Sequence, residues 1–199
     1  MKKQKWKILG VDHVTIAVKD IDFWRRIYTE YLGGKVVCGG NVPDTYPEGP
    51  SSMSLCGLRS RNFRVALVSG IDRKEKSQVT KFIERHGDHS FQHVAVMVSD
   101  LVAFVEDARK HGFKFLGPIL ERKDLFGHVR QVFAKRFDAL STDPAEGMFY
   151  EFVERPKGKT FSGKIPKEFS EKFAKKLYRQ IERARKKNDL ESFVERRKK

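Results

Sequence analysis

Two stretches of the chain share one alternating pattern of apolar and polar residues. Residues 13–20 read HVTIAVKD, and residues 93–100, 80 positions later, read HVAVMVSD. Alternation of this kind predicts a β-strand with one face against a core. The acid that ends each stretch, Asp20 or Asp100, is placed to cap a following helix. We therefore expect a duplicated strand-then-helix unit with a histidine at the same point in each copy.

The same reading extends to both halves of the chain. In the first half we expect a helix from Asp20 to a stop at Gly33-Gly34, a loop over 39–52, and strands near 8–18, 35–38, 54–58 and 63–68. A short helix over 77–85 follows. The second half predicts a helix over 101–110 and strands near 91–98, 113–116, 129–134 and 148–153. Each half has the order βαβββ, so we predict an α+β fold. Two modules, about 8–70 and 88–155, would form a curved mixed sheet around a metal cleft.

The composition indicates the size of the domain and the cellular compartment of the protein. The chain has 199 residues, enough for one sizeable domain or two small repeats with a shared core. Its two cysteines, Cys38 and Cys56, lack a CxxC spacing and indicate a reducing compartment. No apolar run is long enough to span a membrane, so we expect a cytoplasmic protein.

Positive charge is concentrated at the end of the chain. The formal net charge is +15, and residues 156–199 hold 16 Lys and Arg against 6 Asp and Glu, or +10. We therefore divide the chain into a body, 1–155, and a basic tail, 156–199. Apolar residues four apart predict an amphipathic helix over about 167–187. Such a tail could contact nucleic acid or an acidic surface, although a charged helix face is usually only solvated.

Strand alternation also selects candidate metal ligands. The larger apolar residues of the first strand should pack under a helix, which turns His13, and by the same argument His93, toward the concave side. Glu151 shares a strand face with apolar neighbours, where an acid needs a cation or hydrogen bonds. A lone strand histidine is more often a satisfied polar residue, but the repeated placement favours ligands. Two histidines and one carboxylate hold one face of a metal, and Fe(II) is the expected ion.

The paired repeats resemble the vicinal oxygen chelate superfamily, which includes glyoxalases, methylmalonyl-CoA epimerases and extradiol dioxygenases. Residues 12–37, DHVTIAVKDIDFWRRIYTEYLGGKVV, fit many members. The second half resembles the catalytic C-terminal domain of 4-hydroxyphenylpyruvate dioxygenase more specifically. Residues 77–79 and 91–96 resemble its SQI…VQHIAL region, 130–135 its LQIFTKP strand, 149–155 its FxEIIQR strand, and 161–163 its FGxGNF gate.

This resemblance implies specific roles. His13, His93 and Glu151 would bind iron, and the tail would act as an active-site gate. The substrate pocket would be lined by Ser60, Gln78, Gln92, Gln131, Phe133, Phe149 and Phe161. For the phenylalanines the commonest alternative is ordinary core, and for the glutamines an exposed surface. Alternation alone turns Gln92 outward. The implied reaction is oxidative decarboxylation and hydroxylation of an aryl 2-oxo acid with O2, as in aromatic amino acid catabolism.

The sequence also departs from that family. Its PxNEP segment corresponds here to residues 66–70, ALVSG, so Val68 stands where a polar pocket residue would. One alternative is another metal-dependent member, an epimerase or a glyoxalase-like enzyme without oxygen chemistry. A second is a non-enzymatic binding protein that uses its basic tail. A homodimer is compatible with the resemblance, because single-domain members often pair.

Overall fold

The computed structural model describes residues 5–42, 53–61, 63–73, 75–134, 147–157 and 161–162. These residues form three helices and one eight-stranded sheet with the strand order β2-β3-β4-β1-β5-β8-β7-β6. The elements are β1 (Ile8–Ala17), α1 (Ile21–Glu30), β2 (Lys35–Val42), β3 (Met53–Ser60), β4 (Phe63–Gly70), α2 (Gln78–His86), β5 (Ser90–Val98), α3 (Leu101–Lys110), β6 (Phe115–Asp124), β7 (Gly127–Ala134) and β8 (Phe149–Glu154). The predicted α+β class and curved mixed sheet are confirmed.

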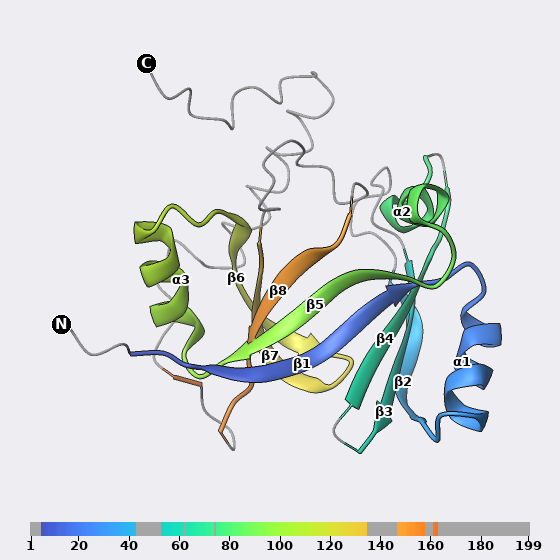
Figure 1. The fold of residues 1–199 in the computed structure, drawn as a ribbon, viewed down its shortest axis with the longest axis horizontal. Coiled ribbons are helices and arrows are strands. Elements are labelled where there is room, and N and C mark those ends of the chain that lie inside the picture. The colour runs from blue at the N-terminus through green and yellow to red at the C-terminus, as the bar shows by residue number, and fades with distance from the viewer. Residues whose placement is uncertain are drawn as a thin grey trace.

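The two halves of the sheet have the same internal arrangement. In the first, β1 pairs in parallel with β4, and in the second β5 pairs in parallel with β8. The antiparallel pair β1–β5 joins the halves at the centre. Figure 1 shows these two strands running side by side, with α1 and α3 at opposite ends of the sheet. The repeated sequence pattern therefore corresponds to a repeated structural unit.

Each module encloses its own apolar core against its helix. Asp20 caps α1 by accepting hydrogen bonds from the backbone N–H groups of Asp22 and Phe23, and Asp100 caps α3 in the same way through Ala103. Tyr28 of α1 packs on the strand residues Ile16, Val18, Leu58, Val65 and Leu67. Leu101, Phe104 and Val105 of α3 pack on Ile119, Val132 and Phe152. A fully buried side chain of this size contributes roughly 1.5–3 kcal/mol. These cores fix one face of the sheet and leave the other free to hold a site.

Two strands differ from the sequence prediction. β2 continues to Val42, where a loop was expected from Gly39, and β6 runs from Phe115 to Asp124 although a strand was expected only over 113–116. Both strands lie at the edges of the sheet. An edge strand tolerates Gly and Pro because one side of its backbone needs no partner. In the sequence, the glycines of β2 and Gly117-Pro118 of β6 predicted the end of a strand. The edge positions of β2 and β6 accommodate these residues.

The predicted tail helix over 167–187 lies outside the described residues. Among the helices that the structure does describe, none is long and apolar enough to cross a membrane.

Candidate metal centre

Three polar side chains from three adjacent strands converge on the concave face of the sheet. His13 comes from β1, His93 from β5 and Glu151 from β8, and one ligand atom of each lies within 4.8 Å of the others. Glu151 Oε2 is 3.4 Å from His13 Nε2 and 3.2 Å from His93 Nε2. The three side chains are 7%, 12% and 4% exposed, respectively. The sheet order explains the convergence, because β5 lies between β1 and β8.

A β-bulge precedes each histidine. In the β1–β5 ladder the partners step from Val11↔Val96 to His13↔Ala95, which leaves Asp12 as an extra residue. They also step from Thr15↔His93 to Ile16↔Phe91, which leaves Gln92 as an extra residue. Bulges of this kind change the direction of a side chain next to a site. Asp12 and Gln92 are accordingly buried, although alternation alone would turn Gln92 outward.

Each extra residue holds the histidine that follows it. His13 Nδ1 donates a hydrogen bond to Asp12 Oδ2 at 2.9 Å, and His93 Nδ1 donates to Gln92 Oε1 at 3.2 Å. An oxygen of either kind can only accept here, so the proton lies on Nδ1 in each ring. If both rings were neutral, their Nε2 lone pairs would face the Glu151 carboxylate with no hydrogen between them. This donor set needs a cation or an added proton at its centre.

Asp12 is itself held by two arginines. Arg155 donates to both of its carboxylate oxygens, at 2.6 and 3.0 Å, and Arg64 donates to Oδ1 at 2.8 Å. Arg155 also binds both oxygens of Asp124, at 2.8 Å each. The carboxylate of Asp12 is 0% exposed, so this network satisfies a charge that would be costly to bury alone. The network fixes His13 through residues from four separate strands or strand ends.

The contacts within the centre shift the acidity of its members. Burial alone would raise the pKa of Glu151, but hydrogen bonds with His13 and His93 outweigh burial and lower this pKa to about 2. Burial alone would lower the pKa of His13, yet its bonds to Asp12 and Glu151 raise it to about 9. At His93 burial dominates and lowers the pKa. Without a metal, a proton on His13 therefore supplies the positive charge that the donor set needs.

The position that corresponds to Glu151 in the first module carries no ligand atom. Glu151 pairs with Ala95 in the β5–β8 ladder, and the residue of β1 that corresponds to Ala95 is Thr15, 80 positions earlier. The β4 partner of Thr15 is Ala66. An alanine at this point leaves a three-ligand set, with open positions on the side of the first module.

Aromatic rings surround the centre. The ring of Phe149 stacks on His93 at 5.0 Å between centroids, and Phe133 meets the same histidine edge-on at 6.0 Å. Phe126, at the turn between β6 and β7, lies 5.3 Å from the ring of His13. The structure thus places two of the expected pocket phenylalanines beside the candidate ligands and adds a third that the sequence did not single out.

The expected glutamines lie in three different settings. Gln131 is 1% exposed and lies on β7 in the ladder position next to Phe133, which pairs with Glu151. Gln92 contacts His93 directly. Gln78 begins α2 and is half-buried, and within the described part of the chain no hydrogen bond joins it to the three candidate ligands.

Two expected pocket residues lie away from the three ligands. Ser60 lines a cavity of about 250 Å³ with Tyr28 and Leu58, on the α1 side of the sheet. The Arg130 guanidinium lies 4.5 Å above the ring of Phe161, on the face that carries α3. Strand alternation gives the reason: Ser60 shares a face with Leu58, and Arg130 shares one with Val132, which are both core residues beneath helices.

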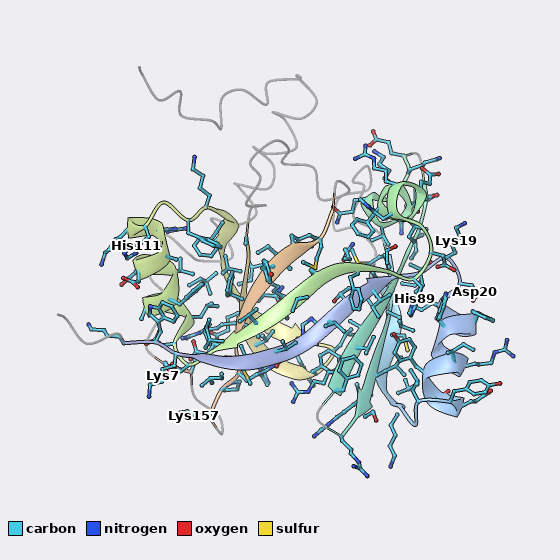
Figure 2. The ribbon with its side chains drawn as sticks, viewed as in Figure 1. Lys7, Lys19, Asp20, His89, His111 and Lys157 are labelled. Carbon is cyan, nitrogen blue, oxygen red and sulfur yellow. The ribbon has the colours of Figure 1, made fainter. Side chains whose placement is uncertain are left out.

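The other histidines are separate from this centre. Figure 2 labels His89 beside α1 and His111 at the end of α3. The ring of His89 stacks on Trp24 at 3.7 Å between centroids, and its Nε2 lies 3.1 Å from the Tyr28 hydroxyl. It therefore secures the junction between α1 and the start of β5.

Sequence reasoning missed the groups that support the ligands, above all Asp12 and Arg155. An acid next to a candidate histidine is a usable signal, because metal-binding histidines usually donate their second N–H to a carboxylate or carbonyl. Arg155 gives no comparable signal, since it lies 143 positions from Asp12.

Comparison with known proteins identifies the family of this chain. The model of the Glyoxalase/Bleomycin resistance protein/Dioxygenase superfamily matches residues 12–126. A comparison with curated protein sequences finds no match.

Solved structures share the fold at low identity. Methylmalonyl-CoA epimerase from Mycobacterium tuberculosis is 26% identical, with a TM-score of 0.55 over 75% of this chain and 91% of that one. A hypothetical protein from Bacillus halodurans C-125 is 20% identical, with a TM-score of 0.56 over 80% and 99%. A mutant of 4-hydroxymandelate synthase from Streptomyces coelicolor is 18% identical, with a TM-score of 0.62 over 86% of this chain and 55% of that one. With its paired modules and the family match over more than half its length, the chain belongs to the Glyoxalase/Bleomycin resistance protein/Dioxygenase superfamily.

Proposed function

We propose that this protein is an Fe(II)-dependent dioxygenase that acts on an aryl 2-oxo acid. The observation that carries the proposal is the convergence of His13, His93 and Glu151, each offering one ligand atom within 4.8 Å. Two imidazoles and one carboxylate on one side of an ion form the ligand set typical of non-haem Fe(II) oxygenases. The alanine at position 66 supports the same assignment, because a chelating substrate and O2 together need open positions.

The donor chemistry fits a divalent cation. Two Nε2 lone pairs and a carboxylate oxygen face one another, and both Nδ1 protons are engaged by Asp12 and Gln92. A bound Fe(II) ion would supply a Lewis acid for a 2-oxo acid and a centre for oxygen activation. His13, His93 and Glu151 would hold it.

The remaining residues shape the pocket. Phe133 and Phe149 would pack against the aryl group and exclude water beside His93. Asp12 and Gln92 would keep both imidazoles oriented throughout the reaction. Thr15, whose hydroxyl lies 2.8 Å from His93 Nε2, would donate its hydrogen elsewhere once that nitrogen binds a metal.

The direct test is oxygen uptake by protein loaded with Fe(II) under anaerobic conditions. A panel of aryl 2-oxo acids, including 4-hydroxyphenylpyruvate and phenylpyruvate, is added to wild type, His93→Ala and His128→Ala. The proposal predicts about one iron per chain and substrate-dependent uptake that is lost only in His93→Ala. His128 is an exposed residue of β7 and serves as the matched control. Iron binding without uptake for any acid would overturn the dioxygenase.

A metal-dependent epimerase is the second candidate. Its support is the similarity to methylmalonyl-CoA epimerase, of which this chain covers 91%. An epimerase uses a divalent ion without consuming oxygen. Proton exchange at an acidic carbon in the presence of Co(II) or Mn(II), with no oxygen uptake, would favour it over the dioxygenase.

A further inference from the structure

Arg122 and Gln131 form a polar pair on the concave face beside the metal centre. In the β6–β7 ladder Gln131 pairs with Leu120, and Arg122 pairs with Val129. Directly paired residues share a face of the sheet. Val129 packs with Ala95 and Val153, which lie on the same face as the three candidate ligands. The arginine and the glutamine therefore extend the concave face away from the metal centre toward the β6 edge.

The amide of Gln131 has a donor without an acceptor. Arg122 Nε donates a hydrogen bond to Gln131 Oε1 at 3.1 Å. Because a guanidinium can only donate, this bond fixes the amide orientation and turns Nε2 away from the arginine. Gln131 is 1% exposed, and its Nε2 has no hydrogen-bond partner among the residues that the structure describes. A buried N–H group without a hydrogen bond is unfavourable, so this amide favours binding of an acceptor beside it.

The guanidinium of Arg122 is the second polar group of this pair. It donates to Gln131, and within the described part of the chain no carboxylate pairs with it. Two other arginines of this face, Arg64 and Arg155, are instead bound to Asp12. The positive charge of Arg122 is close enough to contribute to the lowered pKa of His93. It is thus an available cation near the candidate ligands.

We propose that Arg122 and Gln131 form a carboxylate subsite and that the substrate carries a second acidic group in addition to the one that binds the metal. The fork of a guanidinium matches a carboxylate, and the amide N–H of Gln131 adds a third donor. The proposal rests on the metal-dependent function above and narrows the substrate, because a neutral aryl group would leave the buried amide N–H of Gln131 without an acceptor. The preferred substrate class is a dicarboxylic 2-oxo acid.

The experiment compares two acids that differ only in the second carboxylate, phenylpyruvate and 4-carboxyphenylpyruvate. Binding is followed by the change in the visible absorption of the Co(II)-loaded protein, a readout that needs no turnover. We expect wild type to bind the carboxylated acid about tenfold or more tightly than phenylpyruvate, as a charge-assisted hydrogen bond provides. Arg122→Gln should lose this preference. Arg122→Lys should keep part of it, and Arg26→Gln, on the exposed side of α1, should keep all of it.

The outcomes separate the two proposals. Equal binding of the two acids to wild type, or a preference that persists in Arg122→Gln, overturns the carboxylate subsite and leaves the metal-dependent function standing. A preference that depends on Arg122 supports the subsite even where oxygen uptake is absent, which would overturn only the dioxygenase. If neither acid perturbs the Co(II) spectrum, both proposals are overturned.

Discussion

The two histidine half-sites use one backbone arrangement with different partners. In both, a β-bulge places an extra residue just before the histidine, and that residue accepts the Nδ1 hydrogen bond. In the first module the acceptor is Asp12, a charged group held by two arginines. In the second it is Gln92, which is neutral. The pKa of His13 is accordingly raised to about 9, whereas burial lowers the pKa of His93.

The difference shows that duplication preserved the geometry but not the electrostatics. Hydrogen bonds orient both rings toward Glu151, so a bound metal would have two similar imidazole ligands. Only the first ring is coupled to a buried ion network that spans both modules, since Arg155 binds Asp12 and Asp124 together. We therefore expect the first half-site to contribute more to stability than the second, and both to contribute equally to metal binding.

Loss of either histidine is expected to have the largest effect on metal affinity. The two half-sites should not differ in this respect. His13→Ala and His93→Ala each remove one of three protein ligands, so both should weaken Co(II) affinity by more than the roughly 100-fold that a lost supporting partner costs. Competition with a chromophoric chelator measures the affinity. Wild-type affinity in either variant would remove that histidine from the ligand set.

Replacement of Asp12 should reveal the asymmetry. Asp12→Asn leaves Arg64 and Arg155 facing a neutral group, so we expect the free energy of unfolding to fall by about 3 kcal/mol. Metal affinity should fall roughly 10- to 100-fold. Urea denaturation of the metal-free protein measures the first quantity. Asp22→Asn, which breaks an exposed pair with Arg25, is the control and should cost less than about 1 kcal/mol.

The equivalent change in the second module should be milder. Gln92→Leu removes one neutral hydrogen bond to His93, so the expected loss is about 1 kcal/mol in stability and roughly tenfold in metal affinity. Gln92→Glu restores an acceptor and should keep the affinity near that of wild type. A loss from Gln92→Leu as large as that from Asp12→Asn would contradict the proposed asymmetry.

Replacement of the exposed carboxylate of Asp72 should have the smallest effect on the free energy of unfolding, and this effect should depend on pH. Hydrogen bonds from Thr80 and the backbone N–H of Ser77 lower the pKa of Asp72. Its contribution is complete above the unfolded-state pKa of about 3.9 and is lost as the pH falls through the folded-state value. Asp72→Asn should cost about 0.5 kcal/mol at pH 7 and nothing near pH 2, as urea titrations at both pH values can measure. A cost that is the same at both pH values would contradict this assignment.

Much of the fold and the ligand set follows from local patterns. Alternation along 13–18 and 148–153 placed His13 and Glu151 on the face opposite the helices, and the structure has them there. The caps Asp20 and Asp100 gave the starts of two helices. The two edge strands were harder to predict from the sequence. The glycines of β2 and Pro118 of β6 normally interrupt a strand, and they are tolerated here because each edge strand has a single neighbour.

The sequence by itself determined which residue types face the cleft, because strand period and capping are local properties. Tertiary structure decided how those residues are held. The bulges at Asp12 and Gln92 arise from the pairing of β1 with β5, and no single strand encodes that register. The same holds for the bond between Asp12 and Arg155, 143 positions apart, and for the pairing of Arg122 with Gln131. Such contacts depend on how the whole sheet closes, and the physical reason is that hydrogen bonds and charges act through space rather than along the chain.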